Sequence, residues 1–119
     1  MKDFRKLKVW EKAHQLTLSI YRATRGFPAE ERYGETAQIR RASSSVPGNI
    51  AEGCGRGTDA DFAHFLQMAM GSASELECRL LLARDLEWLD AESHQTLEAQ
   101  ATEVKRMLAS LIRKLRPDT

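Results

Sequence analysis

The stretch QIRRASSSVPGNIAEGCGRG, residues 38–57, decides the fold, because it has the pattern of a helix with two distinct faces. Ile39, Ser43, Val46 and Ile50 recur at steps of four and three, the spacing of a seam that a helix buries. A second seam lies one residue earlier and is small or polar: Gln38, Ala42, Ser45, Asn49, Glu52 and Arg56. We therefore expect a helix over about 35–54 that the glycine-rich run after Glu52 ends.

Pro47 lies in the middle of this pattern, where it removes a backbone donor and crowds the carbonyl group of Ser43. A helix at this point must kink, or a serine hydroxyl must bond to that carbonyl. We predict a kink near Pro47. A sequence that accepts such a local conflict does so for packing or for a site.

Three further helical patterns accompany this one, over about 4–25, 59–88 and 91–115. Gly26-Phe27-Pro28 ends the first, Thr58 and Asp90 are N-caps of the other two, and Pro117 follows the last. Their seams are Leu7, Trp10, Ala13, Thr17, Ile20 and Thr24; Phe62, Leu66, Ala69, Ala73, Leu76, Leu80 and Ala83; and Leu97, Ala101, Val104, Leu108, Leu111 and Leu115. Short connections and the lack of a strand pattern predict an all-α, up-down-up-down antiparallel four-helix bundle in one domain, 1–119.

The composition is that of one ordinary globular domain, with 119 residues, 42% of them apolar and 29% charged. Cys54 and Cys78 are too few and too far apart for a disulfide framework, so we expect reduced, partly buried thiols. The chain has no apolar run long enough to cross a bilayer, and its first residues lack the apolar core of a signal peptide. We therefore expect a cytoplasmic protein without a membrane partner.

Charge is divided unevenly along the chain although the net charge is only +1. Residues 1–57 carry 11 Lys and Arg against 6 Asp and Glu, and residues 58–119 carry 7 against 11. The halves therefore carry +5 and −4. This asymmetry predicts either a basic binding face or two halves that attract each other, within a chain or between subunits.

Arginines supply most of the basic excess, and their planar groups suit phosphate. We predict a sequence-tolerant, salt-sensitive RNA-binding set, Arg22, Arg25, Arg32, Arg40 and Arg41, with Arg56 and the basic N-terminal residues as further candidates. The alternative is a solvated or intersubunit ion-pair role, as the i, i+4 spacing of Glu52 and Arg56 suggests. We expect Asn49, Glu52 and Arg56 to lie on one helix line, where loss of Glu52 costs on the order of 1–3 kcal/mol.

Catalytic patterns are absent from the sequence. The cysteines have no histidine nearby in sequence, and the glycines at 53, 55 and 57 follow no strand, so nucleophilic catalysis and a phosphate loop are not indicated. One enzyme alternative is a ferritin-like dinuclear metal centre, whose candidate ligands are Glu11, His14, Glu52, Asp61, His64 and Glu103. Against it, Asp61 belongs to a helix cap and His64 lies off its seam. We predict a non-enzymatic protein without metal or cofactor.

Apolar residues outnumber the places on the four seams. Ten of them lie off the seams: Val9, Leu18, Met68, Met70, Leu81, Leu82, Trp88, Leu89, Met107 and Ile112. They either widen the core or form surfaces through which the chain associates. We expect a closed homo-oligomer.

Many of these residues together resemble a known family, the bacterial four-helix-bundle proteins associated with 23S ribosomal RNA intervening sequences. The resemblance covers nearly the whole chain. It rests on Phe4, Leu7, Val9-Trp10, Ile20-Tyr21, Phe27-Pro28, Glu31, Tyr33-Gly34, Gln38-Ile39-Arg40-Arg41-Ala42, Asn49-Ile50-Ala51-Glu52-Gly53, Gly55-Arg56, Phe62, Phe65-Leu66, Ala69, Gly71-Ser72, Glu75 and Glu77. The family is distantly similar to the accessory variability protein of diversity-generating retroelements, a basic ring-forming bundle that works with a reverse transcriptase and nucleic acid.

This resemblance implies a homo-oligomeric, pentameric four-helix bundle that binds ribosomal or other structured RNA, or a nucleoprotein partner. It marks Gln38, Asn49, Glu52, Gly53, Gly55 and Arg56 as a structural signature and supplies no catalytic residue. Two positions depart from the family pattern: Glu35 replaces an apolar residue, and Ala73 replaces the common Leu. Both departures bear on contacts between helices. A module that binds only another protein is the alternative function.

Overall fold

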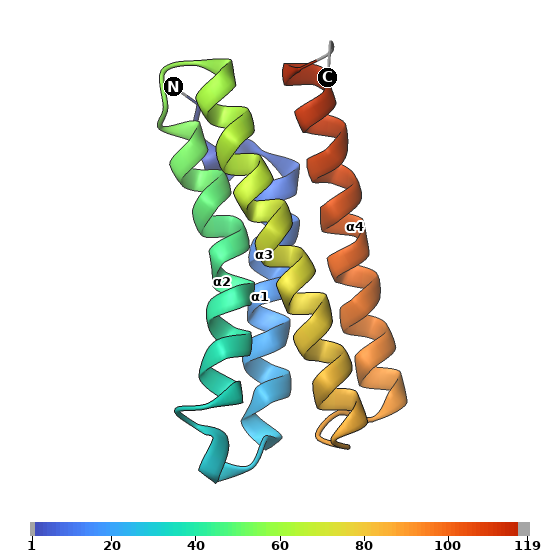
Figure 1. The fold of residues 1–119 in the computed structure, drawn as a ribbon. Helices are drawn as coiled ribbons and strands as arrows, with labels where there is room; N and C mark the ends of the chain where they lie inside the picture. The colour runs from blue at the N-terminus through green and yellow to red at the C-terminus, as the bar shows by residue number, and fades with distance from the viewer. Residues whose placement is uncertain (1, 117–119) are drawn as a thin grey trace.

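Four α-helices form the molecule in the computed structural model, which describes residues 2–116. They are α1 (Lys8–Ala23), α2 (Glu35–Cys54), α3 (Asp59–Asp85) and α4 (Ala91–Leu115). The helices run alternately down and up (Figure 1), and the first and last described residues, Lys2 and Arg116, contact Cys54 and Ala60 at the end where α2 turns into α3. Each helix packs against two neighbours, in the cyclic order α1, α2, α3, α4. The predicted antiparallel four-helix bundle is confirmed.

The ends of two helices differ from the prediction. The first pattern is split into a 3-10 turn at Phe4–Lys6, α1, and a second 3-10 turn at Thr24–Gly26. The third helix ends at Asp85, because Glu87 has a φ of 64°, a left-handed conformation that stops a helix. The amide of Trp88 then donates to the carbonyl of Ala83, which gives one of the last carbonyls a partner. Pro117 lies outside the described residues.

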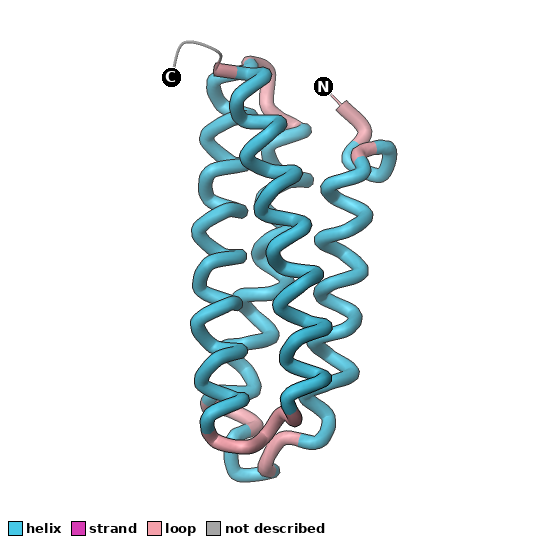
Figure 2. The backbone as a smooth tube through the Cα atoms, turned by 90° about the vertical axis from the view of Figure 1, so that its right-hand side faces the viewer, coloured by secondary structure: helices cyan, strands magenta, loops and turns pink. Residues whose placement is uncertain are grey.

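The predicted caps and connections are present. Thr58 Oγ1 accepts from the Asp61 amide, and Asp90 Oδ1 accepts from the Ser93 amide at 2.7 Å. This bond holds the pKa of Asp90 below its ordinary value. The connection 24–34 contains two 3-10 turns, Thr24–Gly26 and Ala29–Glu31. Figure 2 shows that this connection and the α3–α4 connection lie at the same end of the bundle.

The core follows the predicted seams closely. All seven seam residues of α3 and all four apolar-seam residues of α2 are buried, as are Leu97, Ala101, Val104 and Leu108 of α4. Leu111 and Leu115 are only half-buried. The off-seam residues divide: Val9, Leu89 and Ile112 widen the core, whereas Met68, Leu81 and Leu82 stay exposed.

Pro47 is accommodated inside α2, which continues as one helix across it. The carbonyl oxygen of Ser43, which Pro47 leaves without its helical donor, lies 2.9 Å from the Thr17 hydroxyl of α1. The expected serine donor is wrong, since Ser43, Ser44 and Ser45 direct their hydroxyls to the carbonyls of Arg40 and Arg41. The kink near Pro47 stays a prediction.

None of the described helices is long and apolar enough to span a membrane.

Candidate nucleic-acid interface

The predicted RNA-binding arginines fall into two groups. Arg22, Arg25, Arg32 and Arg40 lie on the last turn of α1, the 24–34 connection and the first turns of α2, so they share one end of the bundle. None of these four pairs with a carboxylate within residues 2–116. Arg41 and Arg56, in contrast, form ion pairs with Glu75 and Glu52.

Arg40 is held in place by neutral groups. Its Nε donates to Thr24 Oγ1 at 2.8 Å, and its Nη2 donates to the Tyr21 carbonyl at 3.3 Å. The guanidinium carbon lies 4.7 Å from the centre of the Tyr21 ring, within the range of a cation–π contact. These contacts fix the group without neutralising it, so its charge stays available to an anion.

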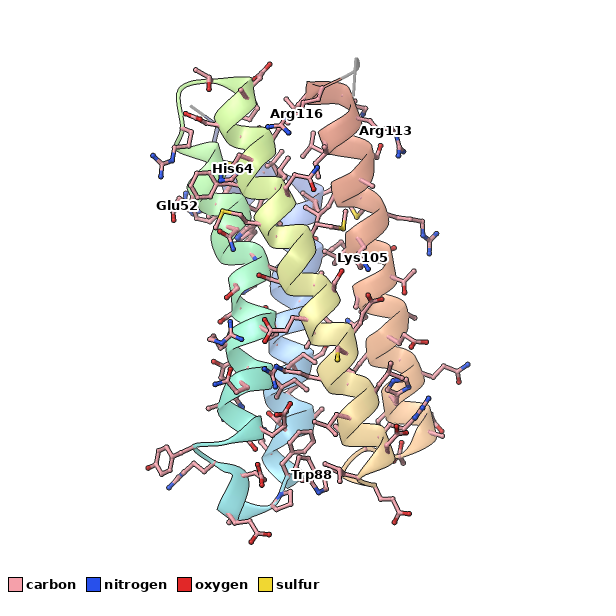
Figure 3. All side chains as sticks on the ribbon, viewed as in Figure 1. Glu52, His64, Trp88, Lys105, Arg113 and Arg116 are labelled. Carbon is pink, nitrogen blue, oxygen red and sulfur yellow. The ribbon has the colours of Figure 1, made fainter. Side chains whose placement is uncertain are left out.

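A cavity of about 390 Å³ opens beside Arg40. We call it the arginine cavity; its lining is Arg25, Arg32, Arg40, Thr24, Thr36 and the apolar segment 27–29. Phe27 is buried and packs against Trp88, with ring centres 5.3 Å apart. Trp88 lies near this end of the bundle in Figure 3. The α3–α4 connection therefore supports the apolar wall of the cavity. Arg22 lies outside it, beside Glu92 in a neighbouring hollow.

Arg41 belongs to a different environment, which we call the α2–α3 ion-pair network: Glu35, Arg41, Glu75 and Arg79. Arg79 Nη1 lies 2.9 Å from each Glu35 carboxylate oxygen, and its Nε lies 2.9 Å from Glu75 Oε2. Arg41 Nη2 donates to the same Glu75 oxygen. The Glu35 side chain is only 14% exposed. The family departure at Glu35 is therefore compensated by an arginine on the facing helix.

Protonation in this network is shifted by its hydrogen bonds. Bonds from Arg79, and then from Arg41, hold the pKa of Glu75 below its ordinary value. Bonds to Glu35 and Glu75 raise the pKa of Arg79 above its ordinary range. Both shifts favour the charged forms of Glu75 and Arg79, and the network joins two arginines to two carboxylates.

Five of the six residues of the structural signature lie towards the opposite end of α2 or just beyond it. Asn49 Nδ2 donates to the Ser45 carbonyl at 2.8 Å, and Glu52 Oε2 accepts from Arg56 at 2.9 Å. Arg56 lies beyond the end of α2 and is placed over the Phe65 ring, 4.7 Å from its centre. The expected line along one helix is therefore wrong for Arg56. The Glu52 side chain is 57% exposed in the single chain, and its expected contact with another subunit stays a prediction.

The two signature glycines have packing roles. A Cβ at Gly53 would lie 2.9 Å from both Phe62 Cδ1 and Phe65 Cβ, closer than carbon atoms approach without a shift. Gly53 therefore lets α2 and α3 meet at the turn that joins them. Gly55 follows directly as the C-cap of α2, with its amide bonded to the Glu52 carbonyl. Gln38, the sixth signature residue, lies in the first turn of α2, is exposed and accepts from Arg41 Nε at 3.2 Å.

One exposed surface of α3 has an unusual composition. We call it the α3 outer face; its exposed residues are His64, Gln67, Met68, Gly71, Ser74, Cys78, Leu81 and Leu82. None of them is Asp, Glu, Lys or Arg. Glu75 lies between them, half-buried and neutralised by its arginine partners. Met68 and Leu82 are 45% and 43% exposed. A helix surface of this composition is typical of a contact with another chain.

The candidate metal ligands do not converge. His14 stacks on Trp10 with ring centres 4.8 Å apart, Glu103 pairs with Lys12, and Glu52 pairs with Arg56. Figure 3 shows Glu52 and His64 near one end of the bundle, while Asp61 lies in the capped first turn of α3. In the described part of the chain, no three His, Cys, Asp or Glu side chains gather into a possible metal site.

Three residues of this interface have no signal in the sequence. Tyr21 lies beside the predicted core seam of the first helix, is 42% exposed and carries the Arg40 contact. Thr24 lies on that seam, where it is buried and accepts from Arg40. Thr36 lines the arginine cavity with a buried hydroxyl that lacks any partner in residues 2–116. All three contacts depend on how α1 and α2 are placed against each other.

Comparisons with known proteins agree on one group. The family profile described as 23S rRNA-intervening sequence protein matches residues 5–110. A solved structure of a protein of unknown function from the S23 ribosomal protein family of Bacteroides thetaiotaomicron is similar, with 25% sequence identity and a TM-score of 0.82. The alignment covers 88% of this chain and 98% of that one. A search of curated proteins finds no match. Neither description names an enzymatic activity.

Proposed function

Because the chain belongs to the 23S rRNA-intervening sequence protein family, we propose that it is a non-enzymatic, self-associating bundle that binds structured RNA or a nucleoprotein. The observation that carries this proposal is the group of unpaired arginines at the end where α1 turns into α2. Arg22, Arg25, Arg32 and Arg40 have no carboxylate partner among the described residues. Arginine in this state offers planar donors that match phosphate oxygens.

Binding of this kind is mainly electrostatic. Each phosphate that the protein neutralises releases counterions, so affinity falls with salt with a log–log slope of about 0.7 to 0.9 per phosphate. Two exposed aromatic rings lie beside the arginines, Tyr21 against Arg40 and Tyr33 against Arg32. The arginines themselves favour contacts to the phosphate backbone, which are sequence-tolerant. Arg41 has a structural role in this proposal, because Glu75 already neutralises it.

Self-association rests on the α3 outer face. Its exposed apolar and small residues, Met68, Gly71, Leu81 and Leu82 among them, are suited to a second copy of the chain. A Cβ at Gly71 would meet no atom within 4 Å, so space for a partner side chain or helix is open there. A closed ring of five chains, as the family resemblance implies, would repeat the arginine group five times. Repetition raises affinity for a long RNA without new contacts.

The proposal places the protein in the cytoplasm. Both Cys54 and Cys78 are free thiols, and Cys78 is exposed, which suits a reducing compartment. Burial raises the pKa of the Cys54 thiol. We therefore expect Cys54 to be less reactive than the exposed Cys78.

RNA binding is tested by filter retention of a 23S ribosomal RNA fragment and of a random RNA of equal length. Salt is varied from about 50 to 200 mM, a range over which a protein with several phosphate contacts loses orders of magnitude in affinity. The double variant Arg25→Gln/Arg32→Gln should lower the slope for both RNAs. The matched control, Arg106→Gln/Arg113→Gln, removes the same charge from exposed residues of α4 and should leave the slope unchanged. If the wild type retains neither RNA at the lowest salt, RNA binding is excluded and a protein partner is sought by pull-down.

Association is tested by light scattering after size exclusion. The wild type should elute as a closed oligomer of five chains, and Met68→Glu/Leu82→Glu should dissociate it. Ala99→Glu, on an exposed site of α4, is the control and should not. A wild-type monomer at micromolar concentration contradicts the self-association proposal, whereas a dimer supports the α3 contact and contradicts the ring.

A further inference from the structure

The arginine cavity is large enough to take more than an ion. Its volume is about 390 Å³, and pockets that bind small molecules begin at roughly 300 Å³. We propose that it binds one nucleotide, with the phosphate group between Arg40 and Thr36 and the nucleoside against the apolar wall. This rests on the proposed function in one respect, since the nucleotide is expected to belong to a bound RNA.

Arg40 is the inner anchor of this site. Its Nε and Nη2 are committed to Thr24 Oγ1 and the Tyr21 carbonyl, which fixes the direction of the guanidinium plane. Its Nη1 has no acceptor within residues 2–116. A donor that is already fixed loses little conformational entropy when a phosphate oxygen arrives. Arg40 therefore combines full charge, fixed geometry and an unused donor.

Thr36 supplies a second polar group. The residue is 7% exposed, it lines the cavity, and its hydroxyl oxygen has no hydrogen-bond partner in the described part of the chain. A buried hydroxyl without a partner costs folding free energy, so such groups are rare without a reason. Threonine in a helix uses two χ1 rotamers, and rotation between them turns the hydroxyl without moving the backbone. A phosphate oxygen in the cavity would be the missing acceptor.

The backbone around Thr36 favours the same ligand. Thr36 is the second residue of α2, and Gly34 provides no side-chain cap at this helix end. The positive end of the helix dipole thus faces this region. One carboxylate competes nearby, because Glu31 Oε1 accepts from the Glu35 amide at 3.0 Å. That bond occupies the first amide of the helix only, and Glu31 is not among the residues that line the cavity.

The remaining lining distinguishes a nucleotide from a bare phosphate. Arg25 and Arg32 are exposed and can close on the charge from outside. Phe27, Pro28 and Ala29 supply an apolar wall, and Trp88 packs against the Phe27 ring. Inorganic phosphate would use only the charged part of this cavity. A sugar or base beside the phosphate would also cover the wall.

Calorimetric titration with uridine 5′-monophosphate tests the site, with uridine and inorganic phosphate as comparison ligands. We expect the nucleotide to bind more tightly than either comparison ligand. Thr36→Val replaces the hydroxyl with a methyl group of similar size and should weaken nucleotide binding about tenfold, as expected for a lost hydrogen bond to a charged group. Its thermal stability should equal or exceed that of the wild type, because the deleted hydroxyl has no partner. Thr96→Val, on an exposed site of α4, is the matched control.

The outcomes separate this inference from the proposed function. If RNA binds with a steep salt dependence while uridine monophosphate does not bind, the nucleotide site is wrong and the general RNA proposal stands. If the nucleotide binds, Thr36→Val weakens it and RNA does not bind, the site is confirmed for a free nucleotide and the RNA proposal fails. Equal nucleotide affinities for Thr36→Val, Thr96→Val and the wild type would overturn the site. Arg40→Gln, checked for folding by circular dichroism, should lose the nucleotide as Thr36→Val does.

Discussion

The arginine cavity and the α2–α3 ion-pair network are built from the same kind of residue in two different surroundings. In the network, Arg41 and Arg79 face Glu75 and Glu35 across two helices, and charge is balanced. In the cavity, Arg40 is held by a hydroxyl, a carbonyl and an aromatic ring, and its charge is not balanced. The two arginines at 40 and 41 are adjacent in sequence. The basic excess of the first half of the chain therefore includes both structural and available charge, and only the partners distinguish them.

The largest effect expected from this comparison is the loss of Arg79. Arg79→Met keeps much of the side-chain volume but leaves Glu35, 14% exposed, without its partner. Hydrogen bonds to charged groups contribute about 1.5 to 3 kcal/mol, so the unfolding free energy should fall by about 2 kcal/mol in urea titrations. Arg41→Met is the internal control, because Arg41 is 51% exposed and should contribute less than about 1 kcal/mol. Equal losses of unfolding free energy for the two variants would show that the different burial of Arg79 and Arg41 does not determine their contributions to stability.

Lowering the pH should also weaken the α2–α3 ion-pair network, because it protonates Glu75. The pKa of Glu75 is lowered in the folded protein by its bonds from Arg79 and Arg41, so its contribution is complete above the ordinary value of about 4.5. It is lost as the pH falls below that value and through the lower pKa of the folded state. The unfolding free energy of the wild type should therefore fall more steeply below this pH than that of Arg79→Met. Parallel curves from urea titrations at several pH values would contradict this assignment.

The exposed pair at the other end of α2 should matter much less. Glu52→Ala removes one i, i+4 contact with Arg56, and both side chains are about half exposed. Pairs of this kind contribute about 0.3 to 0.5 kcal/mol, well below the range expected for a buried seam. Urea titration at low and high salt measures the difference. A loss above about 1 kcal/mol would indicate that Glu52 is covered by another chain in solution.

The smallest effect on stability is expected in the arginine cavity itself. Arg25→Gln/Arg32→Gln should change the unfolding free energy by less than about 0.5 kcal/mol, because neither arginine has a carboxylate partner in residues 2–116. Thermal denaturation followed by circular dichroism suffices to measure this. A clear loss of stability would mean that these arginines hold the 24–34 connection in place and are not simply available for a ligand.

Helices and core were predictable because their signals are local. The seven-residue seam of α3 is complete in the sequence from Phe62 to Ala83, and the caps at Thr58 and Asp90 act within a single turn. The end of α3 was missed because Glu87, in place of the usual glycine, takes the left-handed conformation. A left-handed conformation at a glutamate cannot be recognised from the sequence.

The two charged regions were not predictable, because their contacts join distant positions. Arg79 and Glu35 are 44 residues apart, and Arg40 and Tyr21 are 19 apart. Which side chains meet depends on the axial register of the two packed helices. The hydrophobic periodicity of each helix does not determine that register. The sequence analysis names the arginines as one set, and the sequence could not separate Arg41 and Arg56, which have carboxylate partners, from the others.

The bond between the Thr17 hydroxyl and the Ser43 carbonyl has a consequence for local opening of the bundle. Pro47 leaves that carbonyl without its own helical donor, so α2 alone would expose an unsatisfied acceptor at its midpoint. Separation of α1 from α2 therefore uncovers a defect in α2 as well as its apolar seam. Hydrogen exchange of amides in the middle of both helices should report one shared opening event, whereas Thr17→Val should let α2 exchange faster than α1.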